Sequence, residues 1–396
     1  MAASKGALSG LFVLDLSRIL AGPTCTQLLG DLGATVIKVE NPKTGGDDTR
    51  SWGPNYAQDG SGRATDLSAY FMAANRNKRS LSADLSTQDG QDLLRHLAAR
   101  ADVVIENFKP GGLTKFGLDH ETLCKAYPGL VYCSISGFGQ TGPNRAQPGY
   151  DLMAQGYGGI MSLTGDPEGA PMKVGVGIAD VMCGMYATIG ILAALRHRDQ
   201  TGEGQHIDLS LVDASMAWLI NEGTNFLSSG QLPQRRGNAH PNIVPYDAFD
   251  CADGHILLAV GNDAQFARFC DVIGRAALSE DARFKTNLGR IEHREALMAV
   301  LHPALKRFEK GALLAKLRAV QVPCGPIHTV AEALSSDQAR ARGAVIEMAC
   351  SGVVDDRLRL LGNPLKLSAT PVRYDRPPPR FGQDTEEVLA IWGPAS

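Results

Sequence analysis

One carboxylate in the sequence stands where glycines would bring it close to a reacting group. The segment that runs from Lys173 through Gly175 and Gly177 to Asp180 leads into an apolar run over 181–195. Flanking glycines leave room for a substrate, and a helix starting at residue 181 would point the positive end of its dipole at the carboxylate. This pattern predicts a nucleophilic aspartate held ionised. By residue type alone, a plain helix N-cap is the commoner role for such an aspartate.

A second glycine pattern resembles the dinucleotide-binding fingerprint. Gly137, Gly139 and Gly142 have the required spacing and follow a predicted strand over 130–135. In such sites the pyrophosphate lies at the N-terminus of the helix that follows directly, but Pro143 and Pro148 oppose a helix here. Nicotinamide binding, and with it an NAD-linked oxidoreductase, remains only an alternative.

Composition narrows the classes of partner. The chain has 396 residues, is 44% apolar and 20% charged, and carries a formal net charge of -3. Its overall charge therefore gives no electrostatic attraction to nucleic acid or to an anionic membrane. The apolar run over 181–195 contains two glycines and is shorter than the roughly 20 residues of a membrane-spanning helix. We therefore expect a buried core helix, no nucleic-acid partner and no membrane.

Cysteine usage and the N-terminal segment give further expectations. The eight cysteines form no C-x-x-C pair, and neither H-E-x-x-H nor G-x-S-x-G occurs. We predict no metal site and no disulfide. The first residues show neither a secretory nor a transit-peptide pattern, which predicts a cytoplasmic protein, or a mitochondrial one if a transit peptide precedes this sequence.

The chain pattern that must position these residues is that of an α/β protein. Short β-rich runs at 11–16, 35–39, 102–106 and 130–135 alternate with helical stretches at 22–32, 88–100 and 119–127. Successive βα units predict a doubly wound, mainly parallel, Rossmann-like sheet. The pattern lapses after a Gly-, Pro- and Asn-rich segment at 228–245. We predict a large domain formed by residues 1–225 and 328–396 and a smaller α+β domain over 226–327.

Several separate motifs, in order along almost the whole chain, resemble the class III CoA-transferases, the family of formyl-CoA and carnitine CoA-transferases. The motifs are Leu14-Asp-Leu-Ser-Arg18, Ala21-Gly-Pro23, Gly30-Asp-Leu-Gly-Ala34, Gly46-Asp-Asp-Thr-Arg50, Asn75-Arg-Asn-Lys-Arg-Ser80, Glu106-Asn-Phe108, Gly149-Tyr-Asp151 and Thr201-Gly-Glu-Gly-Gln205. This resemblance implies two interlocked subunits forming a homodimer. It also implies that CoA thioesters are substrates and that no cofactor is bound permanently.

The resemblance also implies a mechanism. Asp180 matches the family's catalytic aspartate, which attacks an acyl-CoA thioester to give a mixed anhydride and then an aspartyl-CoA thioester. Matching CoA-binding positions are Arg18, Leu20, Asn107, Phe108, Lys109, Lys115, Tyr150 and Asp151. Some members have glutamine in place of Leu20 and arginine in place of Asn41. Lys109 and Lys115 suit the anionic phosphates of CoA by charge.

Two other functions on the same fold remain alternatives. An α-methylacyl-CoA racemase needs a second base, a histidine, where this chain has Tyr150, and a free phenol with a pKa near ~10 is a poor proton acceptor. A non-catalytic acyl-CoA-binding protein would keep the basic contacts without needing Asp180. The presence of Asp180 therefore favours a CoA-transferase over a non-catalytic binding protein.

The substrate prediction rests on the loop over 237–246. It lacks the glycine run of formyl-CoA transferases and, with Arg50 and the proline run after Arg376, is most similar to the succinate-hydroxymethylglutarate CoA-transferase group. That similarity implies a succinyl-CoA donor and a dicarboxylate acceptor such as glutarate, hydroxymethylglutarate or itaconate. Arg50 or His240 would bind the distal carboxylate, although His240 would equally suit a loop residue packed on Tyr246.

Overall fold

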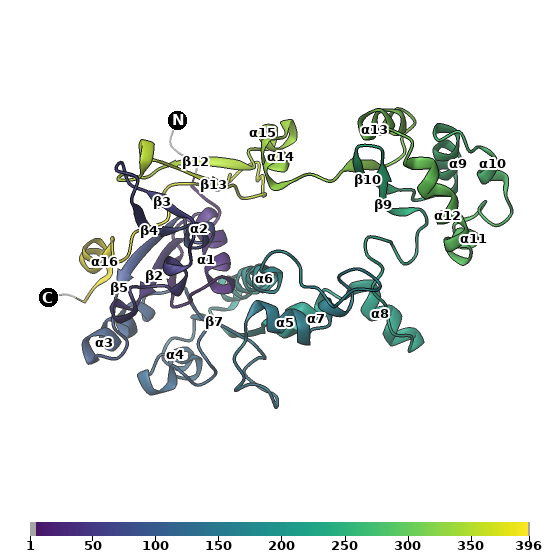
Figure 1. The fold of residues 1–396 in the computed structure, drawn as a ribbon. Coiled ribbons are helices and arrows are strands. Elements are labelled where there is room, and N and C mark those ends of the chain that lie inside the picture. The colour runs from purple at the N-terminus through teal and green to yellow at the C-terminus, as the bar shows by residue number, and fades with distance from the viewer. Residues whose placement is uncertain (1–4, 395–396) are drawn as a thin grey trace. The chain divides into compact units, whose positions relative to one another are not determined.

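The protein, represented by a computed structural model, is described over residues 5–394 and divides into two compact units (Figure 1). The first comprises the chain up to Met161, Lys173–Leu232 and the chain from Asp337 onward, and the second comprises Ser162–Met172 and Pro233–Ser336. The predicted boundaries of the smaller domain lie a few residues earlier than these, and the prediction left Ser162–Met172 in the large domain. Hydrogen bonds explain that assignment, since Arg235 donates to the carbonyl oxygens of Asp166, at 3.2 Å, and Gly169, at 2.7 Å.

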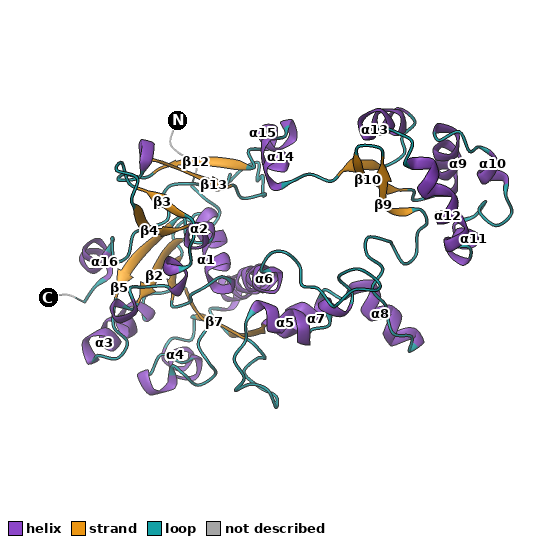
Figure 2. Cartoon of the chain, viewed as in Figure 1, coloured by secondary structure: helices purple, strands orange, loops and turns teal. Residues whose placement is uncertain are grey.

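The first unit contains a six-stranded parallel sheet (Figure 2). Its strands, in spatial order, are β5 (Lys78–Ser82), β2 (Thr35–Glu40), β1 (Phe12–Asp15), β6 (Val103–Glu106), β7 (Val131–Ser136) and β8 (His206–Ser210). The predicted parallel sheet is therefore present.

Helices cover both faces of this sheet, which explains why its strands are continuously apolar. Val13 and Ile105 belong to the core shared with α1 (Ala21–Asp31) and α6 (Ile178–Thr201). The intervening Leu14 and Val104 belong to a second core. That core is shared with α3 (Gln88–Ala98), α4 (His120–Ala126) and α16 (Thr385–Trp392).

The strand order creates a crevice at one edge of the sheet. The chain builds outward from β1 to β2 and β5, then crosses back to β6 beside β1 and continues to β7 and β8. The loops that leave β1 and β6 at their carboxyl ends consequently diverge to opposite faces, and ligands of doubly wound folds bind at that point. We expect a site just beyond Asp15 and Glu106.

The remaining elements of the first unit surround this framework. They are the hairpin of β3 (Tyr56–Gln58) and β4 (Ala64–Ser68), helices α2 (Ala69–Ala73), α5 (Asp151–Tyr157), α7 (Leu211–Ala217), α8 (Ile220–Ser229) and α15 (Asp337–Arg342), and the hairpin of β12 (Val345–Ala349) and β13 (Arg357–Leu361). The C-terminal segment packs on the sheet edge, where Ser80 and Asp384 exchange hydrogen bonds. The predicted return of the last helix to the first part of the chain is therefore observed.

The second unit has its own core and an antiparallel sheet. The sheet has the order β11 (Cys324–Pro326), β10 (Gly254–Ala259) and β9 (Tyr246–Cys251). Its helices are α9 (Asp263–Val272), α10 (Ala277–Glu280), α11 (Asn287–Glu292), α12 (Arg294–Leu305), α13 (Lys310–Ala319) and α14 (Val330–Ser335). Phe249, Phe266 and Phe269 lie at the centre of its core. The unit is α+β in character.

Helix α6 is the core helix that the apolar run predicts. Among residues 5–394 it is the one helix long and apolar enough to cross a membrane, but more than half of that stretch is buried in the protein. Gly184 allows α1 to approach it closely, because a Cβ there would lie 2.6 Å from the carbonyl oxygen of Ala21. All eight cysteines are free.

Candidate active site

A cavity of about 400 Å3 lies at the predicted edge of the sheet. Six separate segments of the chain contribute to it, and most of them lie at or beyond the carboxyl ends of β1, β6 and β7. The lining residues are Arg18, Ile19, Leu20, Ala21, Asn107, Phe108, Lys109, Pro110, Gly112, Ile135, Ser136, Gly137, Gln147, Pro148, Gly149, Tyr150, Asp180 and Leu211. Seven of the predicted site residues therefore meet in one cavity: Arg18, Leu20, Asn107, Phe108, Lys109, Tyr150 and Asp180.

Asp180 lies in the first turn of α6 and does not cap it. The helix begins at Ile178, three residues earlier than the apolar run suggested, and its N-cap is Gly177. The Ala179 N–H donates instead to Asp151 Oδ1, at 2.8 Å. Among residues 5–394, no hydrogen bond or ion pair engages the Asp180 carboxylate. The N-cap interpretation is wrong, and the carboxylate is free to react.

Burial, rather than the helix dipole, dominates the electrostatics of this carboxylate. Burial raises the pKa of Asp180 to about 7, and the nearby charge of Asp151 adds to the rise. The expectation that the dipole keeps Asp180 fully ionised is therefore corrected, because loss of water outweighs the favourable helix end. A more basic carboxylate is a better nucleophile once it is ionised.

Asp151 supports the site and does not line the cavity. Its Oδ2 accepts a hydrogen bond from Gln155 Nε2 at 2.7 Å, while Gln155 Oε1 accepts from the Val174 N–H at 2.9 Å. The buried Gln155 thus ties α5 to the glycine-containing segment that leads to Asp180. The sequence analysis missed Gln155, whose signal is a polar residue four positions after Asp151.

The loops after β1 and β6 are joined by a reciprocal pair. The Arg18 N–H donates to Asn107 Oδ1 at 3.0 Å, and Asn107 Nδ2 donates to the Arg18 carbonyl oxygen at 2.7 Å. The Arg18 guanidinium is exposed and pairs with Asp48 at 2.7 Å. The backbone of both loops is therefore fixed while a cationic group remains at the surface.

The turn at Ile19 is held by a buried ion pair that the sequence analysis did not identify. Ile19 has a φ of 72°, a region in which a β-branched residue is strained by about 1–3 kcal/mol. Its N–H donates to both carboxylate oxygens of Asp47, at 3.2 Å each, and Lys38 Nζ lies 2.7 Å from Asp47 Oδ2. Burial opposes ionisation of Asp47, but Lys38 outweighs it and the pKa falls to about 2. The aspartate thus stays charged and stabilises the turn.

A second cavity of about 330 Å3 adjoins the first and shares Arg18 and Phe108 with it. Asn41, Lys43 and Phe116 also line this second cavity. Lys115 lines neither cavity. Its ammonium group lies over the Phe116 ring, 4.7 Å from the ring centre. The two cavities offer a continuous surface to a long ligand.

Tyr70 is a further residue that the sequence analysis missed. Its ring meets the partly exposed Trp52 edge-on at 5.0 Å between centroids. Burial raises the pKa of the Tyr70 phenol, and the charges of Asp180, Asp151 and Asp47 raise it further. The phenol therefore lies within the field of the site's carboxylates, although it sits in an ordinary apolar stretch of sequence.

Arg50 does not line the cavity and is a structural residue. Its Nε and Nη2 donate to the two carboxylate oxygens of Glu40, at 2.8 and 2.7 Å, and its Nη1 lies 3.1 Å from Asp66 Oδ2. The guanidinium also lies over the Phe71 ring, 3.7 Å from its centre. The expectation that Arg50 binds a substrate carboxylate disagrees with this placement, because its donors are already used.

His240 belongs to the second unit. Its ring packs against Tyr246 at 5.0 Å between centroids, and its Nδ1 accepts a hydrogen bond from the Asn242 N–H at 3.0 Å. Of the two expectations for His240, the packing on Tyr246 is observed.

The glycine fingerprint leads to no phosphate-binding helix. After β7 the chain forms a loop, and no helix begins before Asp151. Gly137 instead packs against Gly149, where a Cβ would lie 2.1 Å from the Gly137 Cα. The glycines serve close backbone packing beside the cavity.

Comparisons with known proteins agree with this geometry. The model of "CoA-transferase family III" matches residues 8–385. A "Succinate--glutarate CoA-transferase" of Agrobacterium fabrum is 47% identical over 98% of this chain and 96% of that protein. A "Succinyl-CoA:glutarate CoA-transferase" of Mus musculus is 37% identical over 96% and 85%. A CAIB/BAIF family protein from Brucella suis, at 46% identity, has a crystal structure that matches with a TM-score of 0.86 over 98% of this chain and 100% of that one.

Proposed function

Because the chain belongs to CoA-transferase family III, as its motifs predicted, we propose that it transfers CoA from succinyl-CoA to glutarate through a covalent intermediate on Asp180. One observation supports this most: an unpartnered carboxylate lies in a cavity that Arg18, Asn107, Phe108 and Lys109 also line. CoA thioesters are the substrates of the enzyme. A racemase or a non-catalytic binding protein fits this family assignment less well.

The proposed reaction uses the Asp180 carboxylate twice. It attacks the thioester carbon of succinyl-CoA, the C–S bond breaks, and a mixed anhydride and CoA thiolate form. The thiolate then attacks the Asp180 acyl carbon, which releases succinate and leaves an aspartyl-CoA thioester. A glutarate carboxylate attacks that thioester, the C–S bond breaks, and CoA thiolate and a mixed anhydride of glutarate and Asp180 form. The thiolate then attacks the glutaryl carbonyl carbon of the anhydride, which gives glutaryl-CoA and frees the Asp180 carboxylate. The half-buried position of Asp180 limits hydrolysis of the anhydride by water.

The two adjoining cavities suggest how CoA lies. Its acyl end would enter the cavity of Asp180 and its nucleotide end the cavity of Asn41 and Lys43, with Arg18 and Phe108 between them. Lys109 and Lys115 are proposed as partners of the phosphates, because ammonium groups stabilise such anions. Tyr150 would contact the acyl portion, and Asp151 would act by holding α6.

The names of the relatives support a choice of substrate. The curated relatives above are named for glutarate, and a related protein of Chloroflexus aurantiacus is named for D-citramalate, so we propose a dicarboxylate acceptor. His240 remains proposed as a contact for the distal carboxylate of the acceptor.

We also propose the interlocked homodimer and a cytoplasmic location. Light scattering would then give twice the chain mass of 42.1 kDa.

Trapping tests the proposed intermediate. The enzyme is incubated with succinyl-CoA and then hydroxylamine, which converts an aspartyl thioester into a hydroxamate that mass spectrometry locates on the peptide containing Asp180. Glutarate, 3-hydroxy-3-methylglutarate, itaconate, malate, citramalate and oxalate are compared as acceptors. We expect the hydroxamate and the fastest transfer with glutarate. Transfer without any modification of Asp180, or transfer to oxalate alone, would refute the proposal.

The charge of Asp151 is expected to set the acid limit of activity. Asp180 must be ionised to attack, so kcat/KM falls as the pH drops through its pKa of about 7. Asp151→Asn removes a negative charge that raises this pKa, and the acid limb therefore moves to lower pH. A pH profile of kcat/KM measures the shift. Asp92→Asn, on the exposed face of α3, is the control and leaves the limb in place; an unmoved limb in Asp151→Asn would exclude this electrostatic role.

A further inference from the structure

A second buried carboxylate lies directly before the loop that we assign to CoA. Glu106 is the last residue of β6 and only 6% exposed. Its Oε2 accepts a hydrogen bond from the Phe108 N–H at 2.8 Å. This bond spans Asn107 and fixes the turn from which Phe108 and Lys109 reach the cavity of Asp180.

The same carboxylate is the end of a polar chain across three strands. Glu106 pairs in register with Ser134 of β7, whose hydroxyl favours the ionised form of the carboxylate. Ser134 Oγ also lies 3.0 Å from His206 Nε2 of β8. The His206 ring stacks on His120, with ring centres 3.7 Å apart and an angle of 9° between the planes. Nothing in the proposed transfer reaction uses this chain.

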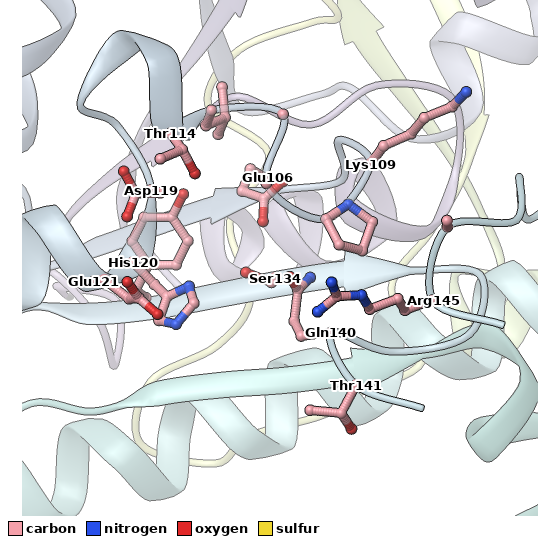
Figure 3. Close-up of a pocket in the computed structure, with 16 residues that line it drawn as sticks. Glu106, Lys109, Thr114, Asp119, His120, Glu121, Ser134, Gln140, Thr141 and Arg145 are labelled. Carbon is pink, nitrogen blue, oxygen red and sulfur yellow. The ribbon is translucent and has the colours of Figure 1, made fainter. Parts of the chain in front are cut away.

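The polar chain opens on a third cavity, of about 540 Å3 (Figure 3). Figure 3 shows Glu106 and Ser134 on neighbouring strands, with Lys109 and Arg145 to one side and the start of α4 to the other. Solvent protons can therefore reach Glu106 from a side other than the CoA site. Lys109 lines both this cavity and the cavity of Asp180, so the CoA loop forms a wall between them.

We propose that Glu106 is a positioning residue whose ionised carboxylate holds the Asn107–Lys109 loop for CoA, so that CoA binding weakens when Glu106 takes up a proton. The proposal rests on the function proposed above. Ionised Glu106 accepts a charge-assisted hydrogen bond from the Phe108 N–H. When Glu106 is protonated, its carboxyl group is neutral. The bond from Phe108 then loses its charge assistance.

The charges around Glu106 support titration near neutrality. Burial raises the pKa of Glu106 to about 7, although Ser134 and the Phe108 N–H favour the ionised form. Burial also lowers the pKa of His206 to about 4, with His120 adding to the fall, so His206 is neutral at pH 7. Other titratable or charged side chains lie on the elements packed around Glu106. They are Tyr132 and Cys133 of β7, Asp119, His120 and Glu121 at the start of α4, Lys109 and Arg145 on the loops, and Asp15 at the end of β1, which pairs with Lys78.

The test measures binding, not turnover, in the full-length protein. Calorimetry gives the Kd of dephospho-CoA, chosen because the 3′-phosphate of CoA itself titrates near pH 6. Asp180→Asn is the background, since it removes the titration of Asp180. We expect the Kd to rise about fivefold as the pH falls through 7, because the Phe108 hydrogen bond is kept but loses its charge assistance. Adding Glu106→Gln makes binding independent of pH.

Two further variants distinguish positioning from general structural damage. Ser134→Ala removes a hydroxyl that lowers the pKa of Glu106, so the midpoint moves to higher pH. This variant tests the proposal even if Glu106→Gln does not fold. Glu121→Gln, at the rim of the same cavity, should leave the midpoint unchanged. Binding that stays pH-dependent in Glu106→Gln, weakens equally at all pH values, or tightens as the pH falls would overturn the proposal. Absence of CoA binding at every pH would overturn the proposed function as well. If the unaltered enzyme transfers CoA normally but binding in the Asp180→Asn background does not depend on pH, only the positioning role is overturned.

Discussion

Asp180→Asn is expected to lower kcat by at least about 10³-fold, the scale of loss when a covalent nucleophile is removed. The amide has nearly the same shape as the carboxylate but carries no charge and does not displace CoA from a thioester. Because no hydrogen bond among residues 5–394 depends on the Asp180 side chain, the fold should be unaffected. Loss of a buried charge should leave CoA binding intact or tighter. Stopped assays with succinyl-CoA and glutarate measure kcat, and calorimetry measures the Kd of CoA.

A matched control separates nucleophilic chemistry from loss of a helix-end charge. Asp213 lies in the first turn of α7, as Asp180 does in α6, but it is exposed and outside the cavity. Asp213→Asn therefore removes a first-turn charge without removing the nucleophile, and its kcat should remain close to that of the unaltered enzyme. Normal transfer by Asp180→Asn, with no hydroxamate in either protein, would mean that Asp180 only supports the helix.

Local pattern was sufficient to predict the sheet, whereas the residues of the principal cavity were predicted from the resemblance to the family. The parallel strands are buried on both faces and their apolar runs are unmistakable, so the βα succession implied the order of layers. The motifs after β1 and β6 then had to converge, because carboxyl ends of parallel strands share one edge. Arg18 and Asn107 meet in this way, and the N-terminal turn of α6 adds Asp180.

The remaining site features depend on tertiary contacts that no local pattern encodes. Residue type alone favoured Asp180 as the cap of α6, yet the first-turn N–H of Ala179 donates to Asp151, 28 residues before Ala179. The helix dipole was expected to lower the pKa of Asp180, but burial raises it, and burial is a property of the whole fold. Tyr70 lies in an apolar stretch of sequence, and only the fold buries its phenol and brings it close enough to Asp180 and Asp151 for their charges to raise its pKa further. Arg50 sits in a motif near the cavity, but its side chain turns to Glu40 and Asp66.

Arg50→Met is expected to destabilise the first unit by about 3–5 kcal/mol, the usual effect of leaving one partner of a buried ion pair alone. Glu40 has a side chain only 1% exposed and would lose both bonds from the guanidinium. Chemical unfolding followed by tryptophan fluorescence measures the loss. Arg63→Met is the matched control, since Arg63 is 82% exposed and pairs with Asp59 at the surface, and its effect should stay within about 1 kcal/mol.

The variant also decides between the two roles considered for Arg50. A structural role predicts that Glu40→Gln, added to Arg50→Met, restores part of the stability, because the unpaired charge is gone and the amide oxygen still accepts the Asp47 N–H. A substrate-binding role predicts a protein as stable as the unaltered enzyme whose KM for glutarate alone rises. The cation–π contact with Phe71 and the bond to the Pro379 carbonyl oxygen at 3.0 Å favour the first result. They join the segment of Arg50, between β2 and β3, to α2 and to the C-terminal segment. A glutarate carboxylate could reach the guanidinium only by displacing Glu40.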